Sequence, residues 1–169
     1  MNRVILLIAF LSVSSTAVVG QWGQAGQEKN LRGLKGLRLV VMFHGADAID
    51  EGERPAILKL VEADASAKFK KAGIPLFRFA NEVEEAGFPQ LIVYITAHKP
   101  NDPVYPLATN VRFLQRVRLA RDSSIEADLA TWETWGVGGP ELTCFEMIRG
   151  LVTTEIEQFI RDYIAVNSR

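Results

Sequence analysis

The chain has 169 residues, of which 48% are hydrophobic, and a formal net charge of −1 at pH 7. That length suits one domain of common size, and the near-neutral charge excludes the overall electrostatic attraction on which nucleic-acid-binding proteins rely. The single cysteine, Cys144, excludes an intramolecular disulfide, and we expect it to be a small buried residue on a helix.

The first twenty residues have the pattern of a cleavable secretory signal. Arg3 precedes an uninterrupted apolar run at 4–11, and small residues follow it. The run is shorter than the roughly 20 apolar residues that a membrane-spanning helix needs. Gly20 fits cleavage after position 20, and cleavage after Ala25 is the alternative. We therefore predict an exported protein, periplasmic or secreted, with no stable membrane span after signal cleavage.

Hydrophobic patterning predicts one domain at residues 37–169, after a flexible Gly- and Gln-rich lead-in at 21–36. Residues 37–44 are strand-like and apolar on both faces. A helix with a broad apolar stripe is expected from Pro55 to about residue 72, where Gly73 supplies a C-terminal cap. A short strand at 75–79 and a central apolar strand at 90–98 are expected to follow.

The sequence of the second half of the domain predicts two long strands and a helix. Residues 107–121 alternate between apolar and basic side chains, and their length indicates a bend or bulge. Residues 122–127 are expected to turn the chain into a last strand at 128–137. From Pro140 onward, apolar residues recur at steps of three and four, which is typical of an amphipathic helix.

Together these elements predict an α+β fold of element order β-α-β-β-β-β-α. It is a two-layer sandwich, in which a five-stranded mixed sheet carries two helices on one face. In this topology the strands at 37–44 and 90–98 run in opposite directions. Because His44 and His98 end those strands, we expect them at opposite edges of the sheet, on the order of 25 Å apart.

Two features are candidate binding residues. A basic row without an acid inside it, Arg112, Arg116 and Arg118, could bind a carboxylate or phosphate, although Glu133 on the neighbouring strand could instead balance it. Trp132 and Trp135 lie three positions apart, so a regular strand sends them to opposite faces. We expect one to pack against a helix and the other to be exposed or to cover the sheet edge, and Trp135 is the candidate binding residue.

No catalytic, cofactor or metal site is predicted. The sequence contains no nucleophile elbow, phosphate loop or paired Cys/His ligand spacing. The acidic residues Asp47, Asp50, Glu51 and Glu53 lack the alternate spacing of a calcium loop, and the helix that follows explains them.

Three segments, "KKAGIP", "ATWETWGVGG" and "EQFIRDYIAVN", carry a resemblance to a family of small exported bacterial proteins of unknown function. That resemblance implies no established activity and no catalytic residue. The order of elements is also similar to the amino-terminal domain of TolB, a likeness of topology alone.

The sequence therefore favours a non-catalytic exported domain that binds an envelope protein partner or assists envelope assembly, with its oligomeric state open. The alternative is a small-anion or ligand-binding protein, or an enzyme, that uses the face of Arg112, Arg116 and Arg118.

Overall fold

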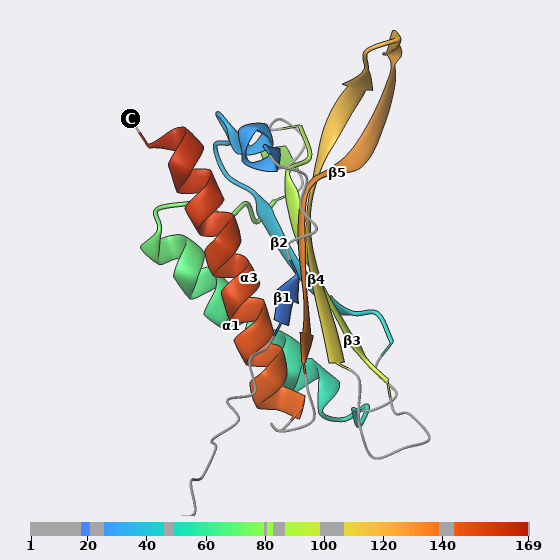
Figure 1. Ribbon diagram of the computed structural model, residues 1–169, viewed down its shortest axis with the longest axis vertical. Helices are drawn as coiled ribbons and strands as arrows, with labels where there is room; N and C mark the ends of the chain where they lie inside the picture. The colour runs from blue at the N-terminus through green and yellow to red at the C-terminus, as the bar shows by residue number, and fades with distance from the viewer. Residues whose placement is uncertain are drawn as a thin grey trace, which may run out of the picture.

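The computed structural model describes residues 18–20, 26–45, 49–79, 81–82, 87–98, 107–138 and 144–168. Figure 1 shows two long helices beside a twisted sheet. The elements are β1 (Val18–Gly20), the short 3-10 helix η1 (Gln27–Leu31), β2 (Arg38–Phe43), α1 (Arg54–Lys71), β3 (Gln90–Ala97), β4 (Leu107–Leu119), β5 (Asp122–Gly138) and α3 (Cys144–Asn167).

The sheet is mixed, with the strand order β1-β5-β4-β3-β2. β2 and β3 are parallel neighbours joined through α1, whereas β3, β4, β5 and β1 follow in antiparallel pairs. The apolar runs of β2 and β3 suit this arrangement, because a parallel pair joined through a helix is buried on at least one face.

The predicted order β-α-β-β-β-β-α and its five-stranded domain sheet are wrong. Residues 75–79 form no strand and contribute only one isolated parallel bridge, from Leu76 to Leu37. Within residues 37–169 the sheet therefore has four strands. The additional strand, β1, consists of three residues inside the predicted signal segment 1–20, and it pairs with positions 135–137 of β5. The α+β class and the two long helices are as predicted.

The reason for the missing strand lies in Glu82. Its Oε2 accepts hydrogen bonds from the backbone N–H groups of Arg78 at 2.9 Å and Phe79 at 3.1 Å. In a continued parallel ladder the N–H of Phe79 would face β2, and its bond to Glu82 makes it unavailable to that edge. Pairing stops after Phe77 donates to the carbonyl of Leu37. A side-chain hydrogen bond thus competes with the sheet for the backbone.

β4 and β5 form a long hairpin that extends beyond the rest of the sheet (Figure 1). β3 pairs with β4 only up to Leu114. The turn lies at residues 120–121, so the predicted turn at 122–127 is wrong and β5 begins six residues earlier than expected. The predicted irregularity is present as a register shift: Phe113 pairs with Trp132 and Leu114 pairs with Ala130, which leaves Thr131 as the extra residue.

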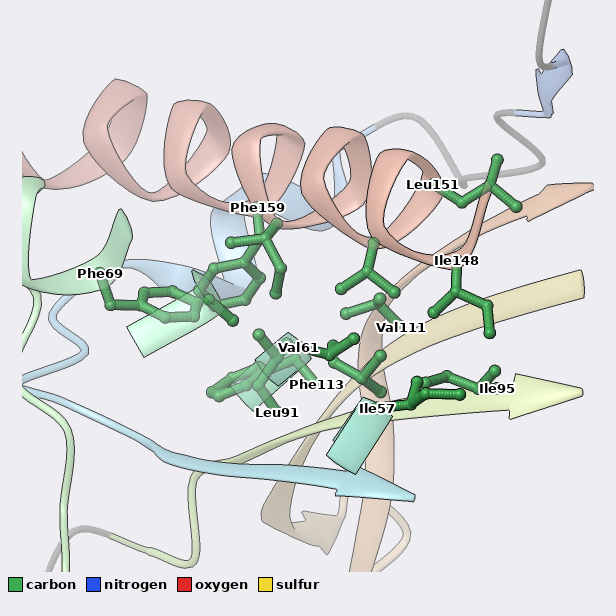
Figure 2. Close-up of a cluster of buried hydrophobic side chains, with 14 of the residues drawn as sticks. Ile57, Val61, Phe69, Leu91, Ile95, Val111, Phe113, Ile148, Leu151 and Phe159 are labelled. Carbon is green, nitrogen blue, oxygen red and sulfur yellow. The ribbon is translucent and has the colours of Figure 1, made fainter. Parts of the chain in front are cut away.

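The core lies between the two helices and one face of the sheet (Figure 2). Fully buried aromatic rings join the layers, since Phe159 of α3 lies 5.5 Å from Phe113 and 6.0 Å from Phe69, measured between ring centroids. Both amphipathic stripes predicted from sequence supply this core. Their buried members are Ile57, Val61, Ala65 and Phe69 on α1, and Ile148, Leu151, Val152, Ile156 and Phe159 on α3.

Part of the predicted lead-in at 21–36 is packed against the domain. Leu31 of η1 is fully buried, and its carbonyl accepts a hydrogen bond from Asn167 near the end of α3. The side chain of Gln27 makes two hydrogen bonds with the backbone of Glu133 on β5. These contacts place η1 beside the edge of β5 and the C-terminal end of α3.

Candidate functional site

The face of the sheet opposite the helices carries the residues that the sequence singled out. We call it the helix-free face; it comprises Val40, Met42, Ile92, Tyr94, Asn110, Arg112, Glu133, Trp135 and Val137. Strand register places Met42, Tyr94, Asn110 and Trp135 in one row across β2, β3, β4 and β5. Met42 is 39% exposed and Val137, beside Trp135 on β5, is 42% exposed. Among the described elements, neither long helix packs on this face (Figure 1).

The first arginine of the row is held by polar neighbours on the same face. Nε of Arg112 donates to Oε1 of Glu133 at 3.0 Å, and Asn110 donates to the same oxygen at 2.8 Å. The Arg112 guanidinium also lies 5.8 Å from the centroid of the Tyr94 ring. The charge of Arg112 is therefore balanced by Glu133 on the neighbouring strand, which is the alternative that the sequence left open.

The other two arginines are paired in the same manner along the hairpin. Nε of Arg116 lies 3.1 Å from Oδ1 of Asp128, and Nε of Arg118 lies 2.9 Å from Oε1 of Glu126. The Arg116 guanidinium also stacks 3.8 Å above the ring of Phe88, whose φ of 56° is positive. The row is thus a ladder of ion pairs rather than a strip of unpaired positive charge.

The β-bulge makes this ladder possible. Up to Trp132 the odd positions of β5 share a face with the even positions of β4, so Glu133 lies beside Arg112. The extra residue Thr131 switches the parity, and the even positions Asp128 and Glu126 then lie beside Arg116 and Arg118. Without the bulge those two acids would point to the opposite side of the ribbon.

The two tryptophans lie on opposite faces, as their spacing predicted. Trp132 is buried against α3, with its ring 5.0 Å from that of Phe159 and nearly perpendicular to it. Trp135 is partly exposed on the helix-free face. Gly138 belongs to β5 rather than to a turn, and a Cβ there would lie 1.9 Å from Sδ of Met147. This glycine therefore allows α3 to approach the sheet closely.

A buried polar cluster lies between α3 and the sheet. Glu155 is 0% exposed, and Thr109 and Thr134 of the facing strands are also buried. Neither carboxylate oxygen of Glu155 makes a hydrogen bond with the described residues. Burial raises the pKa of Glu155 to about 8, and the neighbouring Thr109 hydroxyl opposes that rise. The carboxyl is thus protonated at neutral pH.

The predicted separation of the histidines is wrong. Because 75–79 is not a strand, β3 is the first strand after α1 and runs parallel to β2. His44 and His98 therefore follow their strands at the same end of the sheet. His44 packs its ring 6.1 Å from that of Tyr94, and a Cβ on Gly45 would lie 2.7 Å from Cε1 of His98.

The described residues contain no group of three or more His, Cys, Asp or Glu side chains placed to hold a metal. No helix in the described ranges is long and apolar enough to cross a membrane. Asp47 and the start of the last predicted helix, 140–143, lie outside the described residues. Cys144 is the first residue of α3, and its predicted burial stays a prediction.

A cleft of about 590 Å³ at the outer edge of β2 was missed by the sequence reasoning. Its polar lining includes Glu62, Ser66 and Lys70, and their spacing of four along a helix would have indicated a shared stripe. Tyr94 was also missed, although the alternation of side chains along 90–98 places it on the opposite face from its buried neighbours in β3. Glu155 could have been noticed as an acid inside the apolar stripe of α3.

No protein-family profile and no curated protein matches the chain. Two solved structures of PelC from Paraburkholderia phytofirmans are similar to it. One is a dodecamer carrying a single substitution, with a TM-score of 0.45 and 12% identity over 87% of this chain and 99% of that chain. The other is a dodecamer with a TM-score of 0.38 and 11% identity over 75% and 88%. The expected likeness to TolB is not confirmed.

Proposed function

We propose that this chain is an exported, non-catalytic domain that binds a protein partner of the cell envelope through its helix-free face. The single observation that carries the proposal is the row of Met42, Tyr94 and Trp135 on a sheet face that no long helix covers. Two partly exposed aromatic rings and an exposed thioether gathered on one face favour a protein interface.

The charges on this face favour a protein over a small anion. Each arginine of the row already has a carboxylate partner, so a free anion would have to displace Glu133, Asp128 or Glu126. The partner we infer has an apolar ridge for Met42 and Trp135 and charges of both signs at its margins. The hairpin leans away from α3 in Figure 1, so it can extend the contact along β4 and β5.

Export is supported by the sequence of residues 1–20, with Arg3, the apolar run and the small residues before Gln21. The test is amino-terminal sequencing of the protein recovered from an envelope fraction. A mature chain that begins after Gly20 or after Ala25 agrees with the proposal, whereas an intact Met1 in the cytoplasm contradicts it. Cleavage after Gly20 would also remove β1 from the edge of β5.

Binding can be tested by placing a photo-crosslinking residue at Val137 in the cells of origin. Leu60 is a matched control, because it is 40% exposed against 42% for Val137 but lies on α1. We expect an adduct with one envelope protein at Val137 and none at Leu60. That protein, once purified, should bind the domain at least tenfold more weakly when Met42→Asp is introduced. Equal adducts at both positions would contradict the proposal.

The lesser candidate is anion or ligand binding, or catalysis, on the face of Arg112, Arg116 and Arg118. Its test is calorimetric titration with citrate and phosphate at low salt. Saturable binding that Arg112→Ala abolishes would favour it over the protein-binding proposal.

A further inference from the structure

β2 ends the sheet and has an edge that the rest of the described chain leaves open. In its parallel pairing with β3, the N–H of Arg38 donates to the Pro89 carbonyl and that of His44 donates to the Ile95 carbonyl. The even residues of β2 therefore bond inward. The N–H and C=O groups of the odd residues, Leu37, Leu39, Val41 and Phe43, point away from β3.

Leu37, the first of these odd-numbered residues, shows that the edge can pair with another extended segment. The N–H of Leu37 donates to the Pro75 carbonyl at 3.1 Å, and its carbonyl accepts from the N–H of Phe77 at 2.8 Å. One step of a parallel ladder is thus already made by residues 75–77. Glu82 then draws the chain away, and Leu39, Val41 and Phe43 make no edge hydrogen bond with any described residue.

A cleft of about 590 Å³ lies where the ladder stops. Its size is within the range of common ligand sites. Leu39, Ile74 and Leu76 supply apolar lining, and α1 supplies the polar stripe of Glu62, Ser66 and Lys70. Leu39 belongs to the helix-side face of β2, since it pairs with the buried Leu91. The cleft therefore lies under the open edge, on the side of α1.

The cleft is lined by two cations, Lys70 and Arg78, and one acid, Glu62, and none of the three makes a salt bridge with a described residue. Arg78 also interacts electrostatically with Glu82, whereas Lys70 is the cation that α1 contributes to the lining. Phe79, which follows Arg78, is 66% exposed and is the most exposed large apolar residue of the described chain. Two cations thus lie in the cleft together with Leu39 of the open edge.

We propose that the outer edge of β2 and this cleft form a binding site for an extended peptide, which adds a strand beside Leu39, Val41 and Phe43. Main-chain hydrogen bonds to these residues hold the peptide, and one of its apolar side chains enters the cleft. An acidic residue of the peptide lies near Lys70 and Arg78. This site is separate from the helix-free face and does not depend on the function proposed for that face.

The sharpest variant is Val41→Pro. It removes an N–H that has no partner in the described structure, and proline is tolerated on an edge strand whose N–H faces outward. We therefore expect its melting temperature to stay close to that of the unaltered chain. Lys70→Glu with Arg78→Glu reverses the charge of the cleft without touching the backbone. Leu60→Asp, on the exposed surface of α1 and outside the cleft lining, is the control for a change elsewhere.

The probe is a phage-displayed library of random twelve-residue peptides, selected on the full chain. We expect enriched peptides with alternating apolar residues and at least one acid. A synthesised enriched peptide should bind at least tenfold more weakly to Val41→Pro and to the double charge reversal, and equally well to Leu60→Asp. Amide exchange at Leu39, Val41 and Phe43 should slow at least tenfold on peptide binding.

Four outcomes would overturn the proposal. The selection could yield no enriched peptide, or peptides that bind Val41→Pro as well as the unaltered chain. The three amides could already be protected in the free protein. Finally, the chain could form a dimer that Val41→Pro dissociates, in which case a second copy occupies the edge. Loss of peptide binding with intact crosslinking at Val137 would separate this site from the proposed interface.

Discussion

The indole Nε1 of Trp132 donates a hydrogen bond of 2.8 Å to Oδ2 of Asp162, and so ties β5 to α3. Trp132 is 1% exposed, and the other oxygen of Asp162 accepts a hydrogen bond from Gln158 one turn earlier on α3. The bond lies on the helix side of the sheet, opposite the helix-free face. It therefore fixes α3 against β5 on the side of the sheet away from the proposed interface.

Asp162→Ala should destabilise the protein by about 1–3 kcal/mol, because it leaves a buried indole N–H without an acceptor. Denaturant unfolding followed by tryptophan fluorescence measures the change. In a Trp132→Phe background the same substitution should cost much less, since the donor is gone. Equal costs of Asp162→Ala in the two backgrounds would show that the hydrogen bond contributes nothing to stability.

Glu155 should make the protein less stable as the pH rises from about 4.5 to about 8. Its pKa is 4.5 when it is not perturbed and about 8 in the folded chain, with burial as the main cause. The folded state thus holds a proton that the unfolded state releases, and the free energy of unfolding falls by up to about 1.4 kcal/mol for each pH unit between these values. Above pH 8 this dependence ends.

The check is urea unfolding of the unaltered chain and of Glu155→Gln between pH 4 and 9. No charged side chain contributes to the shift, and the uncharged Thr109 and Gly136 lie beside the carboxyl on the facing strands. We therefore expect the variant to lack most of the slope and to be the more stable of the two at pH 9. Parallel pH profiles would disprove the assignment of the slope to Glu155.

Arg116→Ala should have a small effect, below about 1 kcal/mol, because the pair with Asp128 is exposed and screened by solvent. Lost stacking on Phe88 adds a similar small amount. The exchange Arg116→Asp with Asp128→Arg should recover the ion-pair part but not the stacking. Urea unfolding at low and high salt separates the two, since only the ion pair should weaken with salt.

Replacing Gly138 and replacing Gly150 with alanine should change the stability of the protein in opposite directions. Gly138→Ala places a Cβ on Met147 and should destabilise by about 1–3 kcal/mol through overpacking. Gly150→Ala, inside α3, meets nothing within 4 Å and should stabilise by up to about 1 kcal/mol through helix propensity. Thermal unfolding of the two variants tests the pair. A stabilising Gly138→Ala would mean that α3 can move away from β5 without cost.

Local patterns predicted the elements whose burial is periodic. The stripes of α1 and α3, the apolar runs of β2 and β3 and the opposed faces of Trp132 and Trp135 agree with the structure. These predictions succeeded because the regular period of a helix or strand determines, from a few neighbouring residues, which side chains face the core. The segment 75–79 was misjudged because its strand-like residues compete with Glu82 for backbone hydrogen bonds, a competition that periodicity does not record.

The candidate binding residues were predicted only in part. Alternation in β4 was enough to put Arg112, Arg116 and Arg118 on one face, but their carboxylate partners depend on the bulge at Thr131 and on the length of the hairpin. The cleft beside β2 could not be predicted, because it exists only where α1 and residues 73–78 meet the edge of the sheet.

The sequence by itself determined which side chains turn inward, since helix and strand periods are properties of consecutive residues. Only the tertiary structure decided which strand pairs with which, and in which direction. Pairing brings together residues far apart in the chain, and its free energy depends on contacts that no local window contains. That step placed His44 and His98 at one end of the sheet, gave each arginine its acid and left the outer edge of β2 open.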